Sequence, residues 1–318
     1  MKLRLENIGM IKEATVKLNG LTVIAGENDT GKSTVGKALF AVVNYHQAMF
    51  DKREDDALND YYWIFGEPFN PANNCIALTV DSHTIEYEKF IWELPDPIDT
   101  VFVEAPLVWN FVTLRKQIAL VESQYKIGLD FPFLMRDLIF KLEVKSKTNG
   151  LDIFKNIEHI IHGQIRQDEK GDFFFYKNGK KINLQNTATG IKQFGTLQVL
   201  SKNGHLDEHT VLILDEPEVH LHPKWQLEMA KVIVELVKNG VKVLVNSHSP
   251  YMIEALKRYS DQKEIAQQTD FYLAEKGTIK QIDEDNAKTL VEIYEKLSEP
   301  YDTFEAMESQ RMEKLIHG

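Results

Sequence analysis

The sequence predicts an α/β protein built around a parallel β-sheet, and three observations support this class. A short β-branched run at 21–25 leads into a glycine-containing loop and then into a helical pattern that extends to about residue 50. Two further apolar runs, at 210–214 and 241–245, each end in acidic or polar residues. Because ligands of open parallel sheets bind beyond the carboxyl ends of the strands, we expect all three segments to meet at one sheet edge.

The loop after the first run has the pattern of a phosphate-binding loop. GENDTGKST matches G-x-x-x-x-G-K-[ST], and a glycine loop between a strand and a helix directs backbone N–H groups at phosphates. Lys32 is expected to reach the β- and γ-phosphates of ATP, and the Ser33 hydroxyl to bind Mg²⁺. A chance match in a surface turn is the alternative, which the strand and helix on either side disfavour. The predicted nucleotide-binding residues are Gly26, Asn28, Asp29, Thr30, Gly31, Lys32, Ser33 and Thr34.

The two other apolar runs supply candidate catalytic residues. Asp215 and Glu216 follow the run at 210–214; we expect Asp215 to hold Mg²⁺, usually through water, and Glu216 to orient and deprotonate the attacking water. His248 lies just beyond the run at 241–245, where it could donate a hydrogen bond to the γ-phosphate. The alternatives are a surface acidic pair and an ordinary strand-end histidine. Both are disfavoured because each strand leads to the sheet edge of the phosphate loop.

The remaining patterns predict one domain over residues 1–318 rather than two. A mainly helical region at 111–163 is predicted to be an insertion within this domain, and strand patterns return at 164–184. Asn239 and Gly240 are expected to end a helix that begins at Pro223. The other predicted strands cover 2–6, 14–18, 75–80, 84–94, 100–104, 271–274 and 278–282, and a last helix covers 287–296.

Composition narrows the class of protein further. The chain has 318 residues, of which 43% are hydrophobic and 27% charged, as in a globular protein. The single cysteine, Cys75, excludes an internal disulfide and a thiolate zinc site. The net charge of −11 gives no global support for nucleic-acid binding, although a local basic patch is compatible with it. No run is long enough to span a membrane and the N-terminus lacks a signal-peptide core, so the expected location is the cytoplasm, without a membrane partner.

The motifs GENDTGKST, LILDEPEVHLHP and VLVNSHSP, in this order, resemble those of an ABC-type ATPase head. The motif DEPEVHLHP resembles most closely that of the AAA-family bacterial ATPases related to the RecF, SMC and OLD heads. The stretch at 187–193 resembles the signature loop of these heads; it keeps Thr189, Gly190 and Gln193 but differs at the two positions between. Without the resemblance, Thr189 would be interpreted as a helix N-cap.

The resemblance implies a P-loop NTPase fold with a β-subdomain and the helical insertion, and ATP and Mg²⁺ as cofactors. It also implies a homodimer that forms on ATP binding, in which Thr189 and Gly190 of one subunit contact the ATP held by the other. No TOPRIM carboxylate set follows the head, and the insertion lacks the heptad arms of SMC proteins. Glu104 and Gln117 are alternative candidates for the residue of the Q-loop. His220 and His222, with the nearby Glu216 and Glu218, could suggest a transition-metal site, but this segment matches the D-loop of this group.

Three biological roles are compatible with these motifs. We prefer an ATPase subunit that controls a separately encoded effector protein in a bacterial defence or toxin system. A RecF-like DNA-repair ATPase and the nucleotide-binding subunit of an ABC transporter are the alternatives. ATP-dependent DNA binding would favour the first alternative, and a membrane partner would favour the second.

Overall fold

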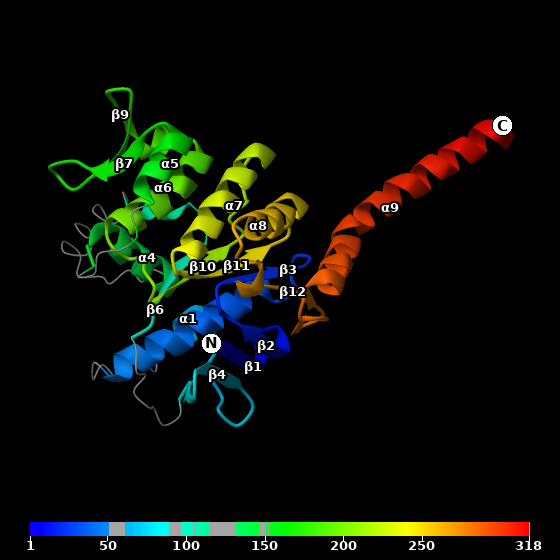
Figure 1. The fold of residues 1–318 in the computed structure, drawn as a ribbon, viewed down its shortest axis with the longest axis horizontal. Coiled ribbons are helices and arrows are strands. Elements are labelled where there is room, and N and C mark those ends of the chain that lie inside the picture. The colour runs from blue at the N-terminus through cyan, green and yellow to red at the C-terminus, as the bar shows by residue number, and fades with distance from the viewer. Residues whose placement is uncertain are drawn as a thin grey trace.

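The computed structural model describes residues 1–50, 61–88, 97–104, 106–112, 114, 132–146, 151 and 153–317. A ten-stranded mixed sheet forms the centre, with helices on both faces (Figure 1). Its strand order is β5-β4-β1-β2-β13-β12-β3-β11-β10-β6. These strands are β1 (Lys2–Ile8), β2 (Ile11–Lys17), β3 (Leu21–Ala25), β4 (Cys75–Val80), β5 (His83–Glu86), β6 (Asp99–Val103), β10 (Thr210–Asp215), β11 (Lys242–Ser247), β12 (Thr269–Glu275) and β13 (Thr278–Lys280).

The half of the sheet from β12 to β6 is parallel, and it brings the three motifs together. Every residue of β3 and β10 is buried, as expected for parallel strands covered on both faces. In the register of β11 with its neighbours, Ser247 pairs with Ala25, and Asn246 pairs with Asp215. The carboxyl ends of β3, β11 and β10 therefore lie at one edge. This confirms the arrangement that the sequence predicted.

Helices cover the two faces of the sheet with separate hydrophobic cores. α1 (Lys32–Phe50) packs on one face through Val35, Leu39 and Val42, which meet Ile213 and Leu244 of the sheet. On the other face, one helix begins in the signature segment, and two others follow the motifs after β10 and β11. These helices are α6 (Thr189–Lys202), α7 (Pro223–Lys238) and α8 (Pro250–Gln262). The two faces of the sheet are thus covered by helices from different parts of the chain (Figure 1).

The other half of the main sheet and a small second sheet form peripheral units. β1, β2, β4 and β5 pair antiparallel, which gives the β-subdomain implied by the resemblance. The second sheet has the order β7-β8-β9. It consists of β7 (Gln164–Gln167), β8 (Phe173–Lys177) and β9 (Lys180–Asn183). The remaining helices are α4 (Phe133–Glu143), α5 (Phe154–Ile161), α9 (Ala287–His317), and the short η1 (Leu184–Asn186) and η2 (Ala266–Gln268).

Several predicted boundaries were wrong or lie outside the described residues. β5 ends at Glu86 because the chain turns there, with Glu88 at a φ of 56°, and residues 89–94 are outside the described part. β11 extends through Asn246 and Ser247, since both continue the pairing with β3. The last helix runs on to His317, far beyond the predicted end at residue 296, and projects from the body (Figure 1). The predicted insertion at 111–163 stays a prediction, since only parts of it are described.

Candidate functional site

The phosphate loop requires glycine at its two motif positions because neighbouring segments approach them closely. A Cβ atom on Gly26 would lie 2.5 Å from the backbone oxygen of Ala274 on the adjacent strand β12. A Cβ on Gly31 would lie 2.5 Å from Cδ1 of Ile11, and the φ of Gly31 is 93°. Asp29, with a φ of 63°, is also left-handed, and such alternation turns successive N–H groups toward one point. The backbone of the loop is therefore shaped to receive an anion.

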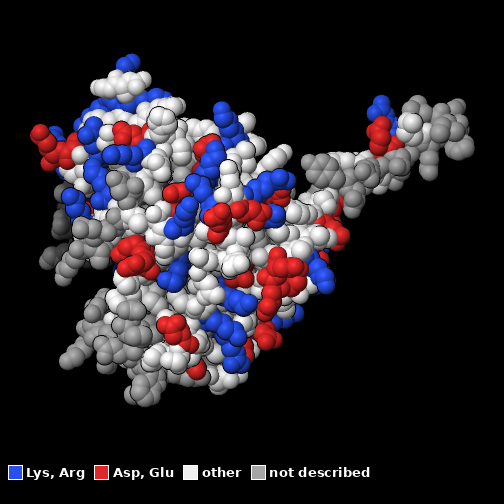
Figure 2. All heavy atoms as spheres, in the orientation of Figure 1, with Lys and Arg blue, Asp and Glu red and all other residues white. Residues whose placement is uncertain are grey.

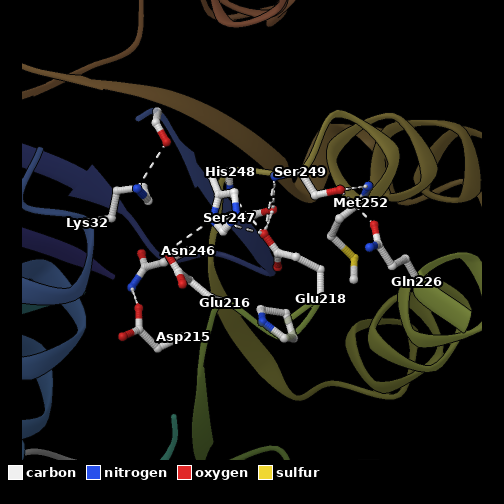
Figure 3. Close-up of polar contacts among 12 residues, drawn as sticks. Lys32, Asp215, Glu216, Glu218, Gln226, Asn246, Ser247, His248, Ser249 and Met252 are labelled. Carbon is white, nitrogen blue, oxygen red and sulfur yellow. Dashed lines mark hydrogen bonds and ion pairs between the residues drawn. The ribbon is translucent and has the colours of Figure 1, made fainter. Parts of the chain in front are cut away.

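Lys32 is the cation of this loop. Its side chain is buried, and Nζ donates to the backbone oxygens of Gly26 at 3.0 Å and Glu27 at 2.6 Å (Figure 3). Burial lowers the pKa of Lys32, and the nearby carboxylates of Glu216 and Asp215 oppose this change. The ammonium group thus lies across the loop, where the predicted phosphate contacts require it.

Ser33 and Asp215 meet although 182 positions separate them in the chain. The Ser33 hydroxyl donates to Oδ1 of Asp215 at 3.0 Å, and Nδ2 of Asn246 donates to the same oxygen at 2.8 Å. Both groups are oxygen donors, the type of ligand that Mg²⁺ prefers. They fit a magnesium ion that the Ser33 oxygen would bind and that Asp215 would hold, usually through water. Burial raises the pKa of Asp215, while the hydrogen bonds from Asn246 and Ser33 oppose the shift.

Glu216 and His248, predicted from separate motifs, face each other in the structure (Figure 3). Oε1 of Glu216 lies 3.1 Å from Nδ1 of His248, and their side chains are 33% and 39% exposed. Glu216 has a φ of 51°, which turns the chain sharply as it leaves β10. A carboxylate and an imidazole in contact, both open to solvent, can orient a water molecule and move a proton.

Glu218 has a role that the sequence analysis did not predict, since there it was considered only as part of a disfavoured metal site. It is 4% exposed, and its Oε1 accepts hydrogen bonds from the Ser247 hydroxyl at 2.6 Å, His248 N at 2.9 Å and Ser249 N at 3.2 Å (Figure 3). Burial raises the pKa of Glu218, while the bonds from Ser247 and His248 oppose the shift. The available signal was the second glutamate of DEPE, three positions after Asp215. Glu218 therefore fixes the backbone that carries His248.

A cavity of about 430 Å³ opens beside these residues. Ser33, Asp215 and Glu216 line it together with Glu104, which directly follows β6. The remaining lining is largely apolar and includes Leu134 and Leu138 of α4. The assignment of Glu104 to the Q-loop stays a prediction, and Gln117 lies outside the described residues.

The predicted signature residues lie at the start of α6, but the helix begins one residue earlier than an N-cap at Thr189 would require. The N-cap is Ala188, so the interpretation of Thr189 as N-cap was wrong; Thr189 is the first helical residue. A Cβ on Gly190 would lie 3.0 Å from Leu221 and 3.2 Å from Trp225. In the described part of the chain, no hydrogen bond joins Thr189 or Gly190 to the phosphate loop. Their contact with the ATP of a second subunit therefore stays a prediction.

His220 and His222 do not form part of a metal cluster. Nδ1 of His222 accepts a hydrogen bond from Lys224 N at 3.3 Å and so caps α7. Over the described ranges, no group of three or more His, Cys, Asp or Glu side chains could hold a metal ion. This agrees with the chemistry of Mg²⁺, which usually binds through one or two protein oxygens together with phosphate and water.

Comparisons with known proteins point to the same class. A family model described as AAA ATPase domain matches residues 115–253. The Septu protein PtuA of Bacillus thuringiensis is 28% identical over 102 residues, which are 32% of this chain and 19% of that protein. The Retron Vc95 probable ATPase of Vibrio cholerae serotype O1 biovar El Tor is 24% identical over 173 residues, 50% of this chain and 31% of that protein. The chain thus covers less than a third of the length of these curated relatives.

Among solved structures, the SMC head domain from Thermotoga maritima aligns with 89% of this chain and across 98% of its own length. The sequence identity is 14% and the TM-score is 0.44. None of the helices in the described part of the chain has the length and apolar composition needed to cross a membrane. The parallel sheet with a phosphate loop after β3 and acidic residues after β10 is the P-loop NTPase arrangement. The fold is therefore that of a P-loop NTPase, and the chain is similar to AAA-type ATPases through a family model that covers less than half of its length.

Proposed function

We propose that this chain hydrolyses ATP between two subunits and thereby controls a separate effector protein. The observation that carries the proposal is the meeting of Ser33, Asp215, Glu216 and His248 at the edge beyond the phosphate loop. Ser33 and Asp215 would hold Mg²⁺, which supplies charge neutralisation to the phosphates when bound. The backbone of the loop and Lys32 would bind the β- and γ-phosphates.

Glu216 would accept a proton from the attacking water, and His248 would donate to the γ-phosphate. When both ring nitrogens of His248 carry protons, Nδ1 donates to Glu216 and Nε2 can donate to the γ-phosphate. The contact with Glu216 fixes the orientation of the ring, and Glu218 fixes the backbone on which the ring is carried. The ATPase site of one subunit would be completed by Thr189 and Gly190 of the other subunit.

Two substitutions test the chemistry. Lys32→Ala removes the phosphate contact, so it should lose ATP binding, measured with a fluorescent ATP analogue. Glu216→Gln keeps the shape of the site, so it should bind ATP but scarcely turn over. The assay is phosphate release with Mg²⁺ and ATP. Wild-type turnover by Glu216→Gln would show that another group accepts the proton.

The two-subunit site is tested by mixing variants that are inactive alone. Lys32→Ala breaks the phosphate loop, and Gly190→Asp places a carboxylate where the signature should meet the phosphates. A mixed dimer contains one broken site and one intact site, so equal mixing should restore about a quarter of wild-type turnover. Each variant must first show a wild-type circular dichroism spectrum. Mixtures that stay inactive, although both variants are folded and Gly190→Asp binds ATP, would rule out the shared site.

ATP should also drive the association itself. Glu216→Gln with ATP should accumulate as a dimer because closure is retained and hydrolysis, which opens the interface, is blocked. Light scattering with and without ATP measures this mass. An unchanged monomer mass in protein that is saturated with ATP would contradict nucleotide-driven dimerisation.

The control of an effector is supported by the relatives, one of which is a Septu protein and another a retron ATPase. The ATPase residues form one site, and we expect no destructive activity from this chain alone. Plasmid DNA, single-stranded DNA and RNA should stay intact with pure protein, ATP and Mg²⁺ or Mn²⁺. A neighbouring gene product that co-purifies in a nucleotide-dependent way would support the role. Cleavage that disappears on a point substitution within this chain would overturn it.

A further inference from the structure

The small sheet β7-β8-β9 presents aromatic side chains on its outer face. Along β8, Phe173 and Phe175 are buried in the core, whereas the alternate residues Phe174 and Tyr176 are partly exposed. The strand register places Arg166 of β7 beside Phe174, and Lys181 of β9 beside Tyr176. The outer face therefore combines two aromatic rings with two cations.

Each cation lies over a ring. The Arg166 guanidinium is 4.5 Å from the ring centre of Tyr176, and Nζ of Lys181 is 3.8 Å from the ring centre of Phe174. Lys181 also pairs with Asp168 at 2.8 Å, but its side chain is 44% exposed. Contacts of this kind between exposed side chains are weak, so a ligand can exchange with them.

A basic cavity adjoins this face. It has a volume of about 630 Å³ and is lined by Tyr176 and Arg166 together with Lys155, His159 and Lys177. Residues 153–202 contain eight Lys or Arg and four Asp or Glu, whereas the whole chain has 37 and 48. Blue side chains accordingly gather over β7, β9 and α5 in the upper left of Figure 2. The acidic net charge of the chain conceals this local excess of basic residues.

We propose that the outer face of β7-β8-β9 and the adjoining cavity bind single-stranded nucleic acid. Phe174 and Tyr176 stack on bases, and Arg166, Lys155 and Lys177 contact phosphates. Alternating aromatic and basic side chains form the stacking surface typical of single-strand binding. A duplex hides the faces of its bases, and an acidic peptide would use the cations without needing the rings.

This surface is complete within one chain. Ile165 N donates to Oε1 of Gln198 at 2.7 Å, and the Ile165 side chain packs against Gly195, so β7 is fixed to α6. No part of the phosphate loop lines the cavity. Binding therefore needs neither ATP nor a second subunit, which separates this proposal from the ATPase cycle.

The test is fluorescence anisotropy with a labelled 20-nucleotide single strand, as DNA and as RNA, and with a duplex of the same length, without ATP. The single strand should bind more tightly than the duplex. Tyr176→Leu and Phe174→Leu should each weaken binding roughly 5- to 150-fold, the range for one lost stack, whereas Tyr176→Phe keeps the affinity. Wild-type thermal midpoints and ATP turnover of these variants show that the fold is retained.

Charge is tested separately. Arg166→Glu with Lys177→Glu should abolish binding, whereas the matched reversal of two exposed lysines on β1 and α9, Lys2→Glu with Lys288→Glu, should leave it unchanged. Lys32→Ala should keep nucleic-acid binding, so a failure of the proposed ATPase mechanism would be recognised independently. Absence of binding, equal binding of the duplex, or wild-type affinity of Tyr176→Leu would each overturn the proposal, the last indicating a surface that recognises charge alone.

Discussion

Glu218 allows the link between buried hydrogen bonds and ATP turnover to be tested. In Glu218→Ala, the Ser247 hydroxyl and His248 N lose their acceptor, whereas Ser249 N keeps the Ser247 oxygen at 3.1 Å. Each buried donor left unpaired costs about 1–3 kcal/mol. Removing a buried carboxylate, whose pKa is raised by burial, offsets part of this cost. The expected loss is therefore about 2–3 kcal/mol of unfolding free energy, or about 3–5 °C in Tm for a chain of 318 residues.

The catalytic effect should exceed the effect on binding. His248 would no longer be held by its backbone, and a displacement near 1 Å can cost up to about 100-fold in rate, so turnover should fall at least about tenfold. ATP binding should change little because the phosphate loop is a separate segment. In Glu218→Gln, the amide oxygen can keep all three hydrogen bonds, and the NH₂ replaces Oε2, which has no hydrogen-bond partner. Stability should stay within about 1 kcal/mol of wild type.

The assays are urea unfolding followed by circular dichroism, and phosphate release at saturating ATP. Glu216→Gln is the matched control, since it makes the same chemical change two positions away and should abolish turnover. Wild-type stability and turnover of Glu218→Ala would refute the positioning role. Turnover by Glu218→Gln as low as that of Glu216→Gln would show that the Glu218 charge takes part in the reaction.

Three further predictions concern packing and charge. Lys141→Ala removes a buried ammonium held by Asp99 at 3.1 Å and Asp137 at 3.2 Å, so urea unfolding should show a loss of about 3–5 kcal/mol; Lys257→Ala, at an exposed pair, should lose about 0.5 kcal/mol or less. Gly195→Ala places a Cβ 2.1 Å from Cδ1 of Ile165, so it should lower the free energy of unfolding by about 1–3 kcal/mol. The loss should be smaller in the background Ile165→Ala, because the Cβ of residue 165 is then the nearest of its atoms, at 3.7 Å from the new Cβ. Additive Tm changes would contradict the contact. Because the folded-state pKa of Glu218 is raised above 4.5, the folded state binds this proton more tightly, and stability falls as pH rises from about 4.5 through the folded pKa. Between pH 5 and pH 8, the free energy of unfolding of Glu218→Gln should therefore rise relative to that of wild type. The opposite trend would contradict the pKa shift.

The sequence by itself determined the ATP-binding motifs and the strands that carry them. Phosphate binding by GENDTGKST depends on consecutive backbone groups, so its spacing is visible without a structure. The same holds for Asp215, Glu216 and His248, each of which directly follows an apolar run that could be recognised as a buried strand. Pro223 as a first helical residue and the stop at Asn239 and Gly240 likewise predicted α7, which runs from Pro223 to Lys238.

Tertiary structure decided which of these residues touch and what surrounds them. The contact of Ser33 with Asp215 depends on the register of strands that are distant in sequence, and local periodicity carries no information on that register. Glu218 could not be distinguished from a surface acid because its burial results from the loop after β11 folding over it. The excess of basic residues at 153–202 can be counted in the sequence, but that Arg166, Phe174, Tyr176 and Lys181 share one face depends on the pairing of β7, β8 and β9, which the sequence does not show.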